Sequence, residues 1–131
     1  MKVLDSDLLV AILRKDPSVD KRIDTLMTSG EPMATTIFNA HEVMLGAMVS
    51  AKSAQNCISA KRLLDSMNII DYDMDCMVKT VSLKTLLIRK GTPIGLFDEM
   101  IAGICLANNA TIVTRNVDHF SKIPDLTVEI W

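Results

Sequence analysis

The chain has 131 residues, of which 49% are hydrophobic and 23% are charged, and this composition excludes an intrinsically disordered or low-complexity protein. Its formal net charge is -2, from 14 Lys and Arg against 16 Asp and Glu, which argues against a general polyanion-binding protein. Aromatic residues make up only 4% of the chain, so a surface that stacks nucleic-acid bases on rings is disfavoured.

A chain of this length fits one compact domain, so we predict a single domain over residues 1–131. The cysteines, Cys57, Cys76 and Cys105, are odd in number and form no CxxC motif. With no apolar signal segment at the N-terminus, they predict reduced thiols and a cytoplasmic protein. Since the only histidines are His41 and His119, a histidine-rich zinc site is excluded.

Predicted strands and helices alternate along the chain. Apolar runs predict strands at residues 2–4, 32–36, 68–72 and 110–114, with 126–130 as a candidate fifth strand. Apolar residues at helical spacing, with Asp, Ser, Pro and Gly at the limits, predict the helices. These helices are expected over residues 8–14, 17–29, 38–49, 53–67, 74–90 and 98–108.

This alternation predicts an α/β domain with a central, mostly parallel sheet of four to five strands and helices on both faces. In such sheets, functional residues gather beyond the carboxyl ends of the strands. Asp5 follows the first predicted strand, and Asp98 opens the helix that leads into the fourth. Glu42 lies in the helix after the second strand, so three acidic residues from distant segments are expected at one edge.

Clustered carboxylates repel one another unless a cation lies among them. Mg²⁺ prefers oxygen ligands and commonly takes one or two carboxylates together with waters and a substrate phosphate. The acidic edge therefore indicates metal-assisted phosphodiester chemistry. Each carboxylate alone also has a structural explanation, because Asp5 or Asp98 can cap a helix and Glu42 can be a solvated helix residue.

Four segments, in this order, resemble the motifs of the PIN-domain family. They are Leu4–Asp7, Thr36–Val43 with the nearby Gly46, Ile94–Ala102 and Val113–Phe120. The resemblance covers essentially the whole chain and is closest to the small VapC-type ribonuclease toxins of prokaryotic toxin–antitoxin pairs. It implies a PIN fold and a Mg²⁺- or Mn²⁺-dependent endoribonuclease that hydrolyses RNA phosphodiester bonds.

The resemblance also implies the catalytic residues, which are Asp5, Glu42, Asp98, Asn116 and Asp118. Asp5, Glu42 and Asp98 match the first three acids of the family and are the expected metal ligands. The position of the fourth acid holds Asn116, and Asp118 lies two residues further on, so either is a candidate for a further ligand. This departure puts a second metal site in doubt.

Four neighbouring polar residues are expected to support the site. Thr36 and Thr114 are placed to hydrogen-bond the carboxylates or a water, although buried structural hydroxyls are an equal explanation. Asn39 precedes Glu42 by one helical turn, so both can face the same cleft. Ser6 is expected to cap the first helix. By contrast, Glu99 is expected to be a solvated charge in the first turn of its helix.

The resemblance implies a small antitoxin partner and a homodimer. An arginine of the antitoxin would suit the acidic cleft, because its guanidinium can bridge two carboxylates. The first two helices, with Leu9, Leu13, Ile23 and Met27, are candidates for an apolar contact with that partner or for ordinary core.

Two other functions remain open. A catalytically degenerate PIN-like scaffold that binds RNA or protein is favoured by Asn116 alone. A receiver-type phosphoacceptor domain would use Asp5 with Asp7 as its metal pair and Asp71 as its phosphorylated residue. Receiver domains, however, place a Lys at the end of the last core strand, where this chain has Arg115.

Overall fold

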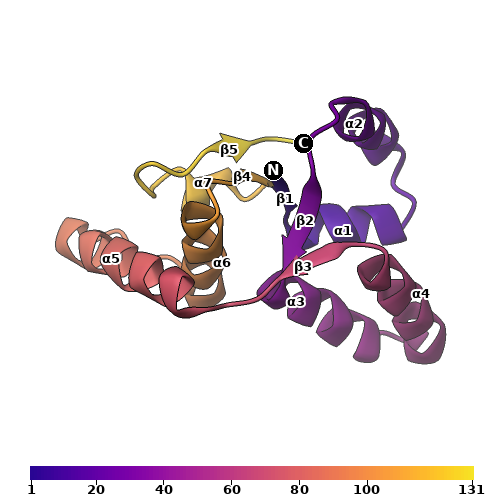
Figure 1. Ribbon diagram of the computed structural model, residues 1–131. Coiled ribbons are helices and arrows are strands. Elements are labelled where there is room, and N and C mark those ends of the chain that lie inside the picture. The colour runs from indigo at the N-terminus through magenta and orange to yellow at the C-terminus, as the bar shows by residue number, and fades with distance from the viewer.

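Five parallel strands form one central sheet in the computed structural model, which describes residues 1–131 (Figure 1). The strands are β1 (Lys2–Leu4), β2 (Met33–Thr36), β3 (Asn68–Ile70), β4 (Thr111–Val113) and β5 (Val128–Glu129). All four pairings are parallel, and the order across the sheet is β3-β2-β1-β4-β5. The candidate fifth strand is therefore present, and the predicted α/β class with a parallel sheet is confirmed.

Seven helices connect or flank these strands. They are α1 (Ser6–Leu13), α2 (Pro17–Thr28), α3 (Ile37–Met48), α4 (Ser53–Asp65), α5 (Met74–Lys90), α6 (Leu96–Ala107) and α7 (Val117–Phe120). The sequence predicted the first six within a few residues and missed α7. The start of α6 also differs, because Gly95 is the N-cap and Asp98 lies within the first turn.

Side chains at the helix starts explain several of these limits. Asp16 and Asp73 accept hydrogen bonds from Ser18 and Cys76 at the starts of α2 and α5. Asp5 caps α1 by accepting from the backbone N–H of Ser6. The expectation that Ser6 caps α1 is therefore wrong.

The order of the strands distinguishes a PIN-like domain from a receiver-type domain. Receiver domains have the order 2-1-3-4-5, in which the third strand lies beside the first. Here β1 lies between β2 and β4, so β2 and β3 are added on one side of β1, and β4 and β5 on the other. This order excludes a receiver-type domain. The point between β1 and β4, where the strand order reverses, is the topological switch point of the sheet.

The sheet separates two buried apolar clusters. Val3 and Ile112 contribute to one cluster with side chains of α5, α6 and α7, whereas Leu4 and Val113 contribute to the other with α1 to α4. This alternation along β1 and β4 is the two-residue period of a strand. In Figure 1, α5 and α6 lie on the left of the sheet and α1 to α4 on the right.

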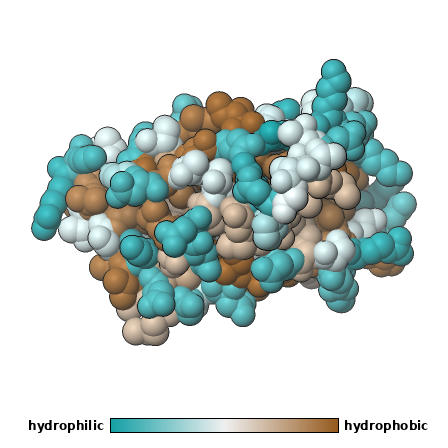
Figure 2. Space-filling model, turned by 45° about the horizontal axis from the view of Figure 1, so that its top comes forward, coloured by the Kyte–Doolittle hydropathy of each residue, from teal (hydrophilic) through white to brown (hydrophobic).

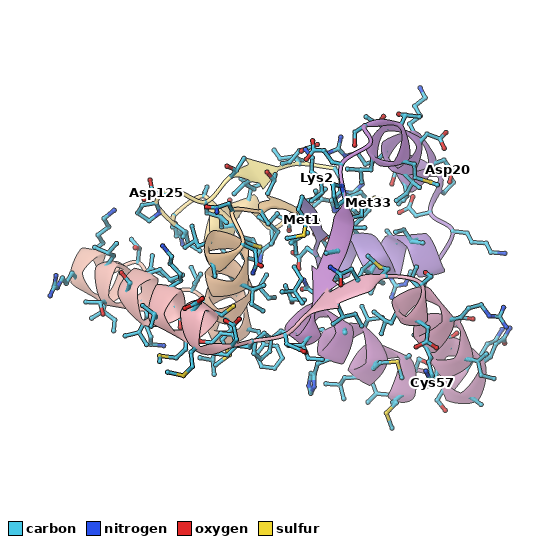
Figure 3. All side chains as sticks on the ribbon, in the orientation of Figure 1. Met1, Lys2, Asp20, Met33, Cys57 and Asp125 are labelled. Carbon is cyan, nitrogen blue, oxygen red and sulfur yellow. The ribbon has the colours of Figure 1, made fainter.

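The amino ends of β1 and β2 lie side by side, with Met1, Lys2 and Met33 close together (Figure 3). Lys2 and Arg22 both form ion pairs with Glu129, which ties β5 to β1 and α2. None of the helices is long and apolar enough to cross a membrane. The three cysteines are unpaired.

Candidate active site

Asp5 is a buried carboxylate at the end of β1, on one side of the switch point, and only 5% of its surface is exposed. Its Oδ1 accepts a hydrogen bond from the Ser6 N–H at 2.8 Å, and its Oδ2 accepts one from the Thr114 hydroxyl at 2.5 Å. Burial, with smaller contributions from nearby Asp7 and Glu42, raises the pKa of Asp5 from its ordinary 3.8 to about 7, although the two hydrogen bonds act to lower it.

Asp98 lies in the first turn of α6 and is in contact with two residues at α7. Its Oδ2 accepts a hydrogen bond from Asn116 Nδ2 at 3.2 Å and lies 2.5 Å from His119 Nδ1. Asn116 and His119 are one helical turn apart, so both reach the same oxygen. His119 is a residue that the sequence analysis missed, and its spacing of three from Asn116 was the available signal.

Asn39 is fully buried in α3, beneath the end of β1. Its Nδ2 donates to the carbonyl of Leu4 at 3.3 Å, and Thr35 Oγ1 donates to the same carbonyl at 2.8 Å. These contacts leave Asn39 Oδ1 buried without a hydrogen-bond partner. A buried acceptor of this kind is normally satisfied by a water or another donor.

Asp7 is a second residue that the sequence analysis did not include among the site residues. Its carboxylate accepts hydrogen bonds from the Arg115 backbone N–H at 2.8 Å and from Trp131 Nε1 at 3.0 Å. It thereby ties the loop after β4, with Thr114 at its start, to α1. Its position two residues after Asp5 was the only signal in the sequence.

The fold agrees with comparisons to known proteins. The family model described as PIN domain matches residues 2–126. The chain belongs to the PIN-domain family. Ribonuclease VapC2 from Rickettsia felis is 32% identical over 129 residues, which cover 98% of this chain and 96% of the relative. The tRNA(fMet)-specific endonuclease VapC from Salmonella typhimurium is 28% identical over the same shares of both chains.

Solved structures of VapC relatives match this PIN domain over nearly its whole length. VapBC2 from Rickettsia felis, bound to a DNA fragment from its promoter, has a TM-score of 0.90 at 31% identity and covers 99% of this chain and 98% of its own. DNA-bound VapBC from Salmonella typhimurium has a TM-score of 0.89 at 28% identity, with 99% and 97% covered.

The PIN fold brings some of the expected site residues together and leaves others apart. Thr114 contacts Asp5, Asn116 contacts Asp98, and Glu42 is near enough to Asp5 to raise its pKa. Asp118 is exposed on α7, and the hydrogen bonds to Asp98 come from Asn116 and His119 instead.

Two further residues have structural roles, of which the one for Thr36 is the structural alternative that the sequence left open. Thr36 is the N-cap of α3, where its hydroxyl accepts from the Asn39 N–H at 3.1 Å. Glu99 is only 3% exposed, and its Oε2 lies 2.8 Å from Lys84 Nζ. The expectation of a solvated Glu99 is wrong because α5 packs across this side of α6.

The donors of this PIN domain suit a hard divalent cation in their chemistry. Asp5, Glu42 and Asp98 offer carboxylate oxygens, and Asn39 adds a buried amide oxygen without a partner. No group of three or more His, Cys, Asp and Glu side chains is arranged to hold a metal ion by itself. Mg²⁺ commonly keeps several waters and takes one or two carboxylates plus substrate phosphate, so a Mg²⁺ site does not require three protein side chains around the ion.

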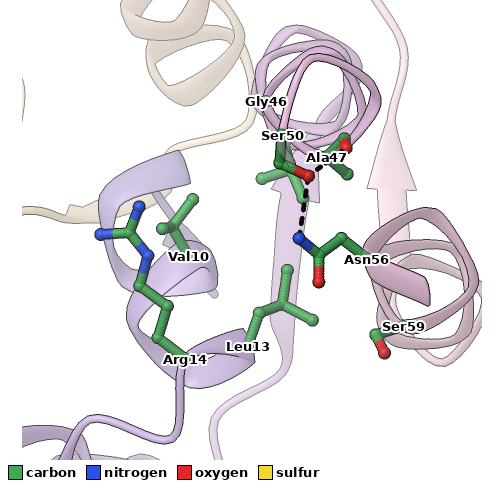
Figure 4. A pocket seen from close by; sticks show the side chains of 9 residues that line it. Val10, Leu13, Arg14, Gly46, Ala47, Ser50, Asn56 and Ser59 are labelled. Carbon is green, nitrogen blue, oxygen red and sulfur yellow. Dashed lines mark hydrogen bonds between the residues drawn. The ribbon is translucent and has the colours of Figure 1, made fainter. Parts of the chain in front are cut away.

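A pocket of about 210 Å³ lies away from these carboxylates, between α1, α3 and α4 (Figure 4). Val10, Leu13, Val43 and Ala47 supply its apolar lining, and Arg14 lies at its side. Across it, Asn56 donates a hydrogen bond to Ser50 at 2.8 Å. None of the candidate catalytic residues lines this pocket.

Proposed function

We propose that this chain is a Mg²⁺- or Mn²⁺-dependent endoribonuclease that hydrolyses RNA phosphodiester bonds and acts as the toxin of a type II toxin–antitoxin pair. The observation that carries the proposal is Asp5, a buried carboxylate beside Asp7 and Glu42 at the switch point of the sheet. A cation at this place would offset the repulsion and the cost of burial. The relatives named ribonuclease VapC2 and tRNA(fMet)-specific endonuclease VapC support the choice of RNA as substrate.

In the proposed mechanism, Asp5 and Asp98 would hold the cation, Glu42 would bind it directly or through a water, and Asn116 is a candidate further ligand. A divalent ion at such a site polarises the scissile phosphate and lowers the pKa of a bound water. The Thr114 hydroxyl fixes Asp5 by donating to its Oδ2. Asn39 Oδ1 would accept a hydrogen bond from the attacking water.

Glu42 is the candidate general base. Its carboxylate would take the proton of the attacking water while the new P–O bond forms. The bond from phosphorus to the leaving oxygen then breaks, and that oxygen takes a proton from solvent. Glu42 is half-buried and close to Asp5, as a base acting beside the bound phosphate needs to be.

The test is cleavage of structured and unstructured RNA by the purified chain, with Mn²⁺ and with EDTA. We expect cleavage only with the cation. The degenerate scaffold, favoured by an amide at Asn116 where the family has an acid, would bind RNA without cutting it under either condition. Cleavage that persists in EDTA would contradict the metal-dependent mechanism.

A small antitoxin is the proposed partner. The similar solved structures are VapBC complexes, in which the VapC relative is joined by a second protein. An arginine from such a partner would bridge carboxylates of the acidic site, and an apolar side chain would fill the pocket of Figure 4. Both proteins would act in the cytoplasm, which the unpaired cysteines favour. Co-purification with the product of the adjacent gene tests this partner.

A homodimer is proposed as well. One face of α5 is buried through Cys76, Leu83 and Leu87, yet the opposite face is also apolar and exposed. Its exposed members recur at helical spacing and are Met74, Val78, Val81 and Ile88. Figure 2 shows apolar side chains among hydrophilic ones at the left end of the molecule, where α5 lies. Light scattering on the isolated chain tests the dimer.

A further inference from the structure

His119 is a partly exposed residue on the four-residue helix α7 that is in direct contact with Asp98. Its Nδ1 lies 2.5 Å from Asp98 Oδ2, and 42% of its side chain is exposed against 19% for Asp98. A carboxylate only accepts hydrogen bonds, so this short contact assigns the proton of the neutral imidazole to Nδ1, and the 3.3 Å approach of Asn116 Nδ2 to the same nitrogen is then not a hydrogen bond. Nε2 is then the nitrogen without a proton.

The contact between His119 and Asp98 extends a hydrogen-bond network that crosses the switch point. The Thr114 hydroxyl donates to Asp5, and the Asn116 backbone N–H donates to Thr114 Oγ1 at 2.9 Å. The Asn116 side chain then donates to Asp98 Oδ2 at 3.2 Å, and His119 approaches that same oxygen. The two carboxylates are thus joined through Thr114 and Asn116, and His119 contacts the Asp98 end of this network.

Two hydrogen-bond donors share one oxygen of the Asp98 carboxylate. Its Oδ2 is directed at Asn116 and His119, which leaves Oδ1 as the oxygen free for another ligand. Partners in the second coordination layer orient metal ligands in this way, and their loss typically weakens metal binding about 10- to 100-fold.

We propose that His119 is a positioning residue that holds Asp98 through Oδ2, so that Oδ1 is presented to the catalytic cation. The inference rests on the proposed function, because it assumes that Asp98 binds the cation. The His119 side chain is not needed to anchor α7. The adjacent Phe120 is fully buried in the apolar cluster beside α6 and fixes α7 to the sheet independently of the imidazole.

Three substitutions of His119 test whether Asp98 needs an N–H donor at the place of Nδ1 or only a side chain of similar size. His119→Asn keeps an N–H near the place of Nδ1, His119→Gln moves it to the place of Nε2, and His119→Ala removes it. His41→Ala is the matched control, because His41 is exposed on α3 and packs its ring against Phe97.

The first measurement is Mn²⁺ affinity by calorimetry, with RNA cleavage measured in parallel. We expect His119→Ala and His119→Gln to weaken Mn²⁺ binding by about 10-fold or more and His119→Asn to restore most of it, with His41→Ala unchanged. Wild-type affinity in His119→Ala, or equal affinities in the Asn and Gln variants, would overturn the proposal. If His119→Ala does not fold, the difference in Mn²⁺ affinity between His119→Asn and His119→Gln still tests the proposal.

The second measurement is the tautomer of His119 in the metal-free chain. Long-range proton–nitrogen NMR at alkaline pH, where imidazole is neutral, is expected to place the proton on Nδ1. A proton on Nε2 would overturn the proposal without any use of the metal. If the wild-type chain has the Nδ1 proton but binds no Mn²⁺, the contact is present and the proposed metal-dependent function is what fails.

Discussion

The Thr114 hydroxyl donates a hydrogen bond to Asp5 Oδ2 across the switch point, although the two residues are 109 positions apart. They meet because β4 lies directly beside β1, with Val113 opposite Leu4. The hydrogen bond favours the ionised carboxylate, but burial outweighs it and keeps the pKa of Asp5 near 7. The carboxylate is therefore held in one orientation before a cation arrives.

Asp5→Asn and Asp98→Asn are expected to lower RNA cleavage by at least about 100-fold, as removal of groups that stabilise developing charge typically does. The fold is expected to survive, because both amides keep the size of the acid. Circular dichroism and cleavage with Mn²⁺ check this, and Asp20→Asn, on exposed α2, is the control. Full activity in both variants would contradict the assigned roles.

The stability of the metal-free chain is expected to fall as pH rises from about 4 to about 7. Over this range the unfolded chain has released the Asp5 proton that the folded chain keeps, since the folded pKa is about 7 against an ordinary 3.8. The full effect above pH 7 corresponds to about 4 kcal/mol. Urea unfolding in EDTA at several pH values measures it.

Asp5→Asn is the control for this pH dependence, because it removes the titrating group while keeping the shape. The variant is expected to be more stable than the wild type above pH 7 in EDTA, and added Mg²⁺ is expected to narrow the difference. Parallel stability profiles for the two proteins would show that Asp5 does not cause the effect.

The sequence predicted the strands and six helices, because periodicity carries that information locally, and it placed Asp5 and Thr114 at strand ends on one edge of the sheet without naming the contact between them. It did not predict α7, since four residues are too few to show a helical period. The contact of His119 with Asp98 depends on how α7 packs on α6, and the spacing of three residues between Asn116 and His119 does not encode that packing. Glu99 was misjudged for a similar reason, because its burial depends on α5.

Asn116→Asp is expected to tighten Mn²⁺ binding and to destabilise the metal-free chain. The change replaces an N–H donor to Asp98 by a second carboxylate, so repulsion grows without a cation and attraction grows with one. Asp118→Asn is expected to change neither quantity, since Asp118 is exposed. Calorimetry and thermal unfolding on both variants check this. A weaker affinity in Asp118→Asn would instead assign the fourth acid to Asp118.

Gly103→Ala is expected to destabilise the fold by about 1–3 kcal/mol, the usual cost of overpacking a core. A Cβ at Gly103 would lie 1.9 Å from Thr80 Oγ1 and 3.0 Å from the Cys76 carbonyl oxygen, where α6 packs against α5. Thr80→Ala is expected to recover part of the loss in the double variant, because it removes the nearer atom. Additive losses would show that this contact is not the cause.

Gly46→Leu is expected to weaken binding of the antitoxin while leaving RNA cleavage intact. Gly46 lines the pocket between α1, α3 and α4, and a Cβ there meets nothing within 4 Å, so the larger side chain fits the fold and fills the pocket. Replacing a helical glycine also stabilises α3 by up to about 1 kcal/mol, so the melting temperature should not fall.

Ala54→Leu, exposed on α4 outside the pocket, is the matched control. The measurement is titration of each variant with the co-purified partner, followed by inhibition of cleavage. Equal affinity of the partner for Gly46→Leu and the wild type would show that the partner binds elsewhere, and weaker binding together with lost cleavage would show damage that reaches the acidic site.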